Sequence, residues 1–296
     1  MVGTFRVALC NEVVRELDFA AQCALAAALG YDGLEVAPFT LSDEPHLLSD
    51  ARIAEFRRAA ADAGIAVSGL HWLLIRPEGL SLTAPDAAMR ARTQDVMARL
   101  VDLCAGLGGS YLVHGSPAQR LLPDGNGAAD ARAWASEAFV AAGAAAARAG
   151  LRYCLEPLSR HETNFVNSIA EAAAVIGTPP APGLATMLDV SAATREEAEA
   201  PAALARRWLP SGLIGHVHLN DTSRRGPGQG DVPIAPVLAA LRQGGYRDWI
   251  GIEPFVYVPD GAGAAARAIG YVRGIETGLG DFAVQRNPGL RMPGGA

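Results

Sequence analysis

The chain has 296 residues, of which 50% are hydrophobic and 19% charged, and its formal net charge at pH 7 is −6. This length suits one large domain with a substantial core. An acidic balance disfavours binding to nucleic acid or to an anionic membrane, so we expect a small-molecule partner.

Short apolar runs alternate with longer amphipathic, alanine-rich stretches. The runs predict eight strands, at 5–10, 32–36, 65–73, 110–114, 151–156, 184–189, 213–218 and 249–253. The stretches that follow them predict eight helices, near 17–29, 50–63, 86–107, 128–149, 167–176, 197–207, 233–243 and 262–279. This alternation predicts the α/β class and a single (β/α)8 TIM barrel. We expect the barrel to occupy 1–280 and a Gly-, Pro- and Arg-rich tail to occupy 281–296.

The cysteines and the N-terminal sequence indicate the cellular compartment of the protein. The four cysteines form no CxxC pair and lie in predicted strands and helices, which is typical of free buried thiols in a reducing cytosol. The N-terminal MVGTFRVAL has no signal-peptide pattern, and no apolar stretch is long enough to cross a bilayer. We therefore expect a cytoplasmic protein.

Four predicted strands end in a carboxylate or an imidazole. The residues are Glu156 in YCLEPL, Asp189 in TMLDV, His218 in GHVHLND and Glu253 in IGIEPF. Because the C-terminal strand ends of a TIM barrel meet at one mouth, these side chains are expected to lie together. Three carboxylates and one imidazole suit Mn²⁺ or Mg²⁺ better than a thiolate metal, so we expect one divalent ion there.

Glu156 and Glu253 also predict proton-transfer chemistry. A metal that holds a substrate carbonyl and hydroxyl acidifies the adjacent C–H bond by stabilising an enediolate. With one glutamate on each face, one removes the proton and the other returns it. Such a pair inverts or moves a stereocentre without an organic cofactor.

Three histidines and a tryptophan are further candidates for substrate binding. His216 lies two residues before His218 and shares its face of the strand. His71 and Trp72, in GLHW, and His114, in LVHGSP, lie at or near the ends of other strands. For His71 and His114, hydrogen bonding without a catalytic role is an equal alternative.

Charged residues near the same mouth offer other contacts. Arg224 and Arg225 lie in a Gly-rich loop after His218, where an arginine can hold substrate oxygens through its planar fork. At least one of the two is expected to be only solvated. Glu35 ends the second predicted strand. Whether its side chain lines the mouth or not is an even choice from the sequence.

The segments LEP, MLD, HVHLND, RRGPGQGD and IEPF, with YDGLEV near the start, resemble the sugar phosphate isomerase/epimerase superfamily of xylose isomerase-like TIM barrels. Within it, the chain looks like the ketose 3-epimerases of the D-tagatose and D-psicose type. The resemblance implies one Mn²⁺ or Co²⁺ ion at the four ligands, with Glu156 and Glu253 as the acid/base pair. We expect Mn²⁺, with Mg²⁺ and Co²⁺ as alternatives, and a homodimer or homotetramer.

The resemblance also assigns substrate contacts. It implies that Glu162 contacts substrate hydroxyls near C1 and that Arg224 binds the substrate. The chain departs from the pattern at Ala192, where the epimerases carry a histidine three residues after the metal aspartate. His216 or His114 can take its place, or the substrate differs from a free ketohexose.

We therefore predict a metal-dependent sugar isomerase or epimerase that acts on a ketose or a related carbonyl compound. The alternative is a lyase that dehydrates a keto-polyol, such as a keto-inositol, at the same metal site. An apurinic endonuclease would need a multi-zinc site with several more histidines than the six present here. A non-catalytic sugar-binding barrel would not need both glutamates.

Overall fold

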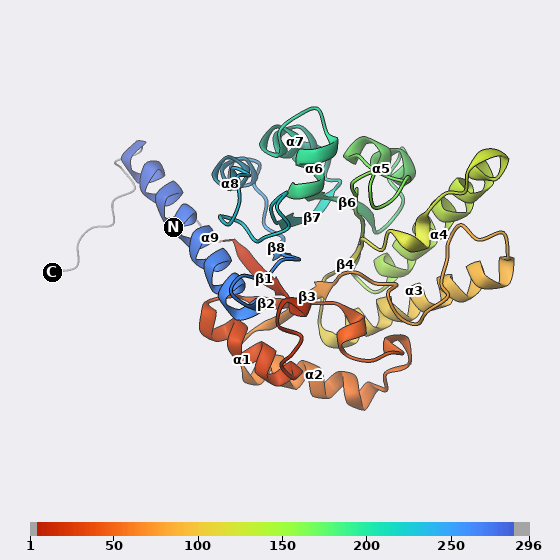
Figure 1. Cartoon of the computed structure of the whole chain (residues 1–296), viewed down its shortest axis with the longest axis horizontal. Coiled ribbons are helices and arrows are strands. Elements are labelled where there is room, and N and C mark those ends of the chain that lie inside the picture. The colour runs from red at the N-terminus through yellow and green to blue at the C-terminus, as the bar shows by residue number, and fades with distance from the viewer. Residues whose placement is uncertain (1–4, 287–296) are drawn as a thin grey trace.

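The structure, a computed structural model, describes residues 5–286. Eight parallel strands close into a barrel in chain order (Figure 1). They are β1 (Arg6–Cys10), β2 (Gly33–Val36), β3 (Ala66–Leu70), β4 (Tyr111–His114), β5 (Arg152–Leu155), β6 (Leu184–Asp189), β7 (Ile214–Leu219) and β8 (Trp249–Ile252). The predicted (β/α)8 barrel is confirmed, with strand bounds within a few residues of those expected.

Helices form the outer layer around this barrel (Figure 1). They are α1 (Phe19–Leu29), α2 (Asp50–Asp62), α3 (Ala87–Leu107), α4 (Ala128–Arg148), α5 (Ile169–Ile176), α6 (Val190–Glu196), α7 (Pro201–Trp208), α8 (Ile234–Gln243) and α9 (Gly261–Arg286). Short 3-10 turns are η1 (Asn11–Val14), η2 (Pro38–Thr40), η3 (Pro45–Leu47), η4 (Ala118–Arg120), η5 (Gly125–Gly127) and η6 (Leu209–Ser211).

One region differs from the predicted helices. A single helix was expected at 197–207, but α6 begins directly after β6 and α7 follows it. The side chain of Asp189 accepts a hydrogen bond from the backbone N–H of Ala192, which starts α6 at the strand end. Pro201 at the first turn of α7 starts the second helix.

Side-chain alternation decides which residues face the barrel interior. Buried residues of alternate parity form an inner cluster: Ala8, Tyr111, Val113, Cys154, Ala185, Met187 and Trp249. The opposite parity packs on the helices in a larger cluster. Continuing the inner parity to the strand ends brings Glu156, Asp189, His218 and Glu253 to the same mouth.

The last helix closes the outer layer beside α1 and α8 (Figure 1). It runs through Arg286, so the first residues of the expected 281–296 tail continue α9, and the remainder lies outside the described residues. Among residues 5–286, no helix has the length and hydropathy needed to span a membrane. All four cysteines are buried and free.

Candidate active site

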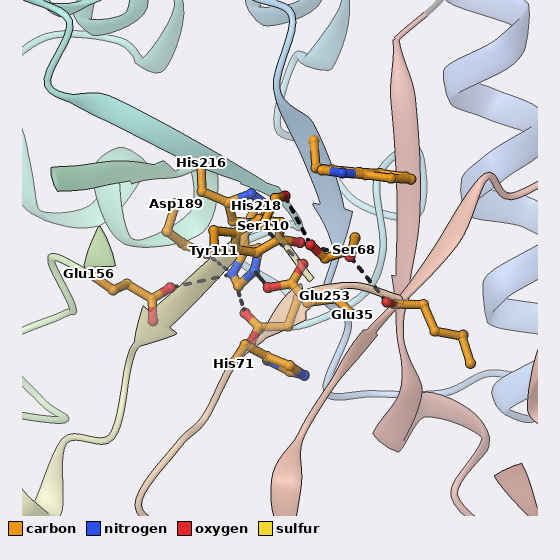
Figure 2. A network of polar contacts seen from close by, with 12 residues as sticks. Glu35, Ser68, His71, Ser110, Tyr111, Glu156, Asp189, His216, His218 and Glu253 are labelled. Carbon is orange, nitrogen blue, oxygen red and sulfur yellow. Dashed lines mark hydrogen bonds and ion pairs between the residues drawn. The ribbon is translucent and has the colours of Figure 1, made fainter. Parts of the chain in front are cut away.

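Four residues from consecutive strands converge at the mouth. The Nδ1 atom of His218 lies 3.4 Å from Glu156 Oε1 and 3.2 Å from Glu253 Oε2. Asp189 Oδ2 lies 3.9 Å from the same nitrogen. All four side chains are buried, and one ligand atom from each lies within 4.8 Å of the others. Figure 2 shows Glu156 and Glu253 approaching His218 from different sides.

Glu35 determines which nitrogen of His218 faces this cluster. Its Oε1 lies 2.9 Å from His218 Nε2, and its Oε2 lies 3.1 Å from His216 Nε2. Because a carboxylate only accepts hydrogen bonds, both Nε2 atoms donate. Although burial opposes ionisation of Glu35, the two histidines hold its pKa well below the usual range. The Nδ1 of His218, which has no hydrogen-bond partner among the described residues, therefore faces the cluster.

Without a metal, positive charge in the cluster comes from a protonated His218. Burial disfavours the charged form of His218, but Glu253 and Glu35 outweigh burial and raise its pKa well above the usual range. Burial, together with the charges of Glu156 and Glu253, raises the pKa of Asp189 to about 8. Burial also raises the pKa of Glu156. Buried carboxylates at such short separations are stable as anions only beside positive charge. Three carboxylate oxygens and an unpartnered imidazole nitrogen are therefore a donor set that fits a divalent cation.

Asp189 is oriented by two hydrogen bonds. Its Oδ1 accepts from the backbone N–H of Ala192 at 2.6 Å, and its Oδ2 accepts from Asn220 Nδ2 at 2.6 Å. Asn220 is itself held, because its Oδ1 accepts from the backbone N–H of Ser191 at 2.8 Å. The start of α6 and the end of β7 thus fix one carboxylate between them.

Glu156 is supported from the loop after β4. The fully buried Arg120 donates through Nη2 to the backbone carbonyl of Glu156 at 2.7 Å and through Nη1 to that of His114 at 3.4 Å. Burial lowers the pKa of Arg120 to about 10, so it remains a cation at neutral pH. Gly115 lets the carboxylate pass close to the chain, because a Cβ there would overlap Glu156 Oε2.

Glu253 is supported in a different way. Its Oε1 lies 3.1 Å from Nδ1 of His71, and Nε2 of His71 lies 2.9 Å from Glu12 Oε2. Burial opposes the ionisation of Glu253, but His218 and His71 lower its pKa to about 2. For His71, burial disfavours the charged form, and Glu12 with Glu253 outweighs it and raises its pKa to about 10.

A cavity of about 160 Å³ opens above the cluster. Glu156, Asp189 and Glu253 form part of its floor. The other lining residues are Trp72, Gly115, Pro117, Leu158, Ser159, His161, Glu162, Ser191, Ala192, Arg195, Asn220, Asp221, Arg224 and Phe255. The cavity combines apolar walls with several polar groups, as small-molecule sites commonly do.

Aromatic residues and an arginine form one wall of the cavity. Trp72 makes edge-to-face contact with Phe255, with ring centroids 5.8 Å apart. The guanidinium of Arg224 lies 5.3 Å from the ring centroid of Phe255. The backbone carbonyl of Arg224 accepts from the N–H groups of Phe255 and Val256 at 2.8 Å each. These contacts tie the loop after β7 to the loop after β8.

The predicted substrate residues divide into two groups. Trp72, Glu162 and Arg224 line the cavity, whereas the three histidines His71, His114 and His216 are not among its lining residues. His114 has the outward parity of β4, contacts the ring of Phe139 and hydrogen-bonds to Tyr153. His216 stacks on Tyr111 inside the barrel, with centroids 4.1 Å apart (Figure 2).

Three residues that support the site were not predicted from the sequence. Glu12 lies two residues after the end of β1, so the strand-end argument used for the other acids also applies to it. Asn220 lies in the HVHLND segment, but no role was predicted for it. Arg120 lies in a long loop, and no spacing in the sequence indicated that it folds beneath Glu156.

The match to known proteins agrees with this architecture. The profile of the family described as xylose isomerase-like TIM barrel matches residues 23–275. The chain belongs to this family. The membership predicted from the strand-end motifs is thereby confirmed.

Individual relatives are named as sugar epimerases. The chain is 30% identical over 235 residues to D-psicose 3-epimerase of Agrobacterium fabrum, covering 78% of this chain and 77% of that protein. It is 28% identical over 232 residues to L-ribulose 3-epimerase of Methylomonas sp., covering 78% and 76%. A solved structure of L-ribulose 3-epimerase superposes with a TM-score of 0.78 at 22% identity, over 98% of this chain and all of the other. The predicted isomerase class is confirmed by these relatives.

Proposed function

We propose that this protein is a metal-dependent sugar epimerase that moves a proton at the carbon next to a ketose carbonyl. Glu156 and Glu253 are the acid/base pair. Together with Asp189 and His218 they hold one divalent ion, Mn²⁺ in our proposal, with Mg²⁺ and Co²⁺ as alternatives. The relatives named as ketose 3-epimerases support the substrate class.

The observation that carries this proposal is the placement of Glu156 and Glu253. Both carboxylates approach one buried imidazole nitrogen from different sides, and both line the same cavity. A single general base would suffice for removing a proton. Two glutamates allow removal on one face and return on the other, which is what inversion of a stereocentre requires.

Other residues of the site would orient a metal ligand, exclude water and bind the substrate. When bound, the divalent ion would act as a Lewis acid that polarises a substrate carbonyl. Glu35 keeps the Nδ1 lone pair of His218 directed at the cluster. Trp72 and Phe255 limit the access of water from one side, and Arg224 can donate to substrate hydroxyls. Glu162, which also lines the cavity, can accept from them.

The substrate-binding wall differs from the epimerase pattern at Ala192. The small side chain lines the cavity, and Arg195, one turn further along α6, lines it too. Arg195 also donates to the backbone carbonyl of Thr222, so the loop after β7 restrains it. We propose that this wall selects among ketoses, which makes a panel of substrates necessary.

The proposal also covers the cellular compartment and the oligomeric state. Four buried, unpaired thiols suit a reducing, cytoplasmic setting. The resemblance to ketose 3-epimerases supports a homodimer or homotetramer, which sedimentation equilibrium of the purified protein would measure.

The proposed function is tested by incubating the Mn²⁺-loaded protein in D₂O with D-psicose, D-fructose, D-tagatose, L-ribulose and a keto-inositol. Deuterium in a product of otherwise unchanged mass, together with a new epimer by NMR, supports the proposal. Loss of the mass of water would instead identify a dehydratase. Activity that survives complete chelation would remove the metal from the mechanism, and no exchange with any compound would reject ketose epimerisation.

A further inference from the structure

We propose that Glu12 and His71 form a positioning pair that holds Glu253 in place for proton transfer. Proton transfer by Glu253 then depends on this pair, whereas proton transfer by Glu156 does not. The inference rests on the proposed function for its kinetic consequence. Its structural consequence, the strength of metal binding, can be measured without any substrate.

The two oxygens of Glu253 have different partners. Oε2 lies on the side of the cluster, 3.2 Å from His218 Nδ1. Oε1 points the other way and lies 3.1 Å from His71 Nδ1. A carboxylate held at both oxygens cannot rotate about its last bond without losing a contact. His71 therefore sets the plane of the Glu253 carboxylate, although it does not line the cavity.

Glu12 in turn sets the ring of His71. Its Oε2 lies 2.9 Å from His71 Nε2, and both side chains are buried. Glu12 lies in η1, whose first residue, Asn11, is fixed by three hydrogen bonds. Asn11 donates to Gln22 Oε1 at 2.9 Å and to Thr40 Oγ1 at 2.7 Å, and it accepts from the backbone N–H of Ala37 at 2.8 Å. The segment carrying Glu12 is thus anchored to two neighbouring elements.

The backbone after His71 is also constrained. Trp72 has φ of 51°, in the left-handed region that a bulky residue rarely adopts. It is held there by edge-to-face contacts with Phe39 and Phe255, at centroid distances of 5.4 and 5.8 Å. A backbone kept in this conformation at a strand end, beside the cavity, points to a local requirement. Directing His71 inward and Trp72 toward the cavity satisfies it.

Among the residues that the structure describes, Glu156 has no equivalent pair. The carboxylate of Glu156 contacts His218, with Oε1 3.4 Å from Nδ1. Arg120 contacts the backbone carbonyl of Glu156 rather than its side chain. Gly115 approaches the carboxylate without offering a side chain. Loss of the Glu12–His71 pair should therefore impair proton transfer at Glu253 and leave transfer at Glu156 intact.

This asymmetry has a measurable signature. From one epimer the proton is removed by Glu156, and from the other by Glu253. When Glu253 is mispositioned and the reaction runs in D₂O, Glu156 exchanges the proton it has taken for a solvent deuteron. Glu156 then returns this deuteron to the same face of the substrate. Deuterium then enters the recovered substrate faster than product forms, but only when the reaction starts from the epimer that Glu156 deprotonates.

The test uses Glu12→Gln and His71→Asn in full-length protein at saturating Mn²⁺, starting from each member of an epimer pair that the wild type interconverts. Tyr31→Phe is the matched control, since it removes a buried hydrogen bond, to the carbonyl of Ala265, away from the mouth. We expect kcat to fall roughly 10- to 100-fold, the range for groups that orient metal ligands, with KM changed less than about threefold. The ratio of exchange to conversion should rise about tenfold or more from one epimer and stay unchanged from the other.

A second readout needs no substrate. Calorimetric titration with Mn²⁺ should show affinity reduced about tenfold in Glu12→Gln and His71→Asn but not in Tyr31→Phe. Unchanged Mn²⁺ affinity in both variants would overturn the positioning role whether or not a substrate is known. An exchange ratio that changes equally from both epimers would also overturn it. A wild type that binds Mn²⁺ but turns over no ketose would reject the proposed function and leave the calorimetric result to decide the inference.

Discussion

Glu35 Oε1 lies 2.9 Å from His218 Nε2, and both side chains are completely buried inside the barrel. The second oxygen of the same carboxylate lies 3.1 Å from His216 Nε2. The register between β2 and β3 shifts between Leu34 and Glu35, at the point where this side chain enters the interior. One buried carboxylate thus orients both histidines of β7.

Replacing Glu35 with glutamine should weaken metal binding. An amide can donate to His218 Nε2, which then places a proton on Nδ1, where the metal would bind. We expect Mn²⁺ affinity to fall about 10- to 100-fold, as for other partners of metal-bound histidines. Calorimetric titration of Glu35→Gln against wild type measures this. Equal affinities would show that the tautomer of His218 does not depend on Glu35.

Replacing either proposed acid/base residue should stop epimerisation without unfolding the protein. Glutamine keeps the shape of Glu156 or Glu253 but cannot accept the substrate proton. We expect kcat to fall about 10²- to 10⁴-fold in Glu156→Gln and in Glu253→Gln. Steady-state kinetics at saturating Mn²⁺ measures the loss, and circular dichroism checks the fold. Retained turnover in either variant would contradict the assignment of that residue.

In the metal-free protein, protonated Asp189 should contribute stability that is lost as pH rises from 5 to 6.5. The pKa of Asp189 is raised from 3.8 to about 8 in the folded state, so the folded protein binds more protons than the unfolded chain between these values. The stability that this proton contributes is fully present below pH 3.8 and is lost as pH rises toward 8. Thermal unfolding of the wild type and of Asp189→Asn, with chelator present, measures this contribution. The Tm of the wild type relative to that of Asp189→Asn should fall as pH rises from 5 to 6.5, and a constant difference would be the contrary result.

The same proton should make metal binding depend on pH. Because Asp189 must lose it before ligating an ion, the apparent Mn²⁺ affinity should rise with pH, by up to about tenfold per unit below pH 8. Titrations at pH 6, 7 and 8 in buffers that do not bind Mn²⁺ measure this dependence. Affinity that is constant across the series would mean that no proton is displaced.

A methyl group at Gly115 should disturb the site directly. A Cβ there would overlap Glu156 Oε2, so the carboxylate must move from its place. We expect Gly115→Ala to lose most activity, by about tenfold or more, as displaced catalytic groups do. The matched control is Gly274→Ala in the exposed part of α9, where a Cβ meets no atom within 4 Å. That variant should be active and more stable by up to about 1 kcal/mol.

Removing the Arg224 guanidinium should weaken substrate binding. Arg224 lines the cavity, whereas the adjacent Arg225 does not. Hydrogen bonds from a charged donor contribute about 1.5–3 kcal/mol, so KM should rise roughly 10- to 100-fold in Arg224→Ala. Arg225→Ala should have a KM near that of the wild type. Equal KM values for the two variants would place the substrate away from this wall.

The sequence by itself determined the barrel and its mouth. Hydrophobic periodicity marked each strand and most helices, because burial demands a local pattern that can be read residue by residue. The acids at the ends of β5, β6 and β8 and the imidazole of His218 on β7 followed from the rule that parallel strands end at one face. Only α6 was missed, since it begins where Asp189 serves both as a strand end and as a helix cap.

Only the tertiary structure decided which polar groups support that mouth. His114 ends β4 and His71 follows β3, yet His114 packs toward the helices and His71 points toward Glu253. The partners Glu12 and Arg120 come from segments distant in sequence from the carboxylates they support. Their roles depend on distances between strands that the closed barrel brings together. A buried side chain is paired by its neighbours in space, and one strand's pattern carries no record of what lies across the barrel.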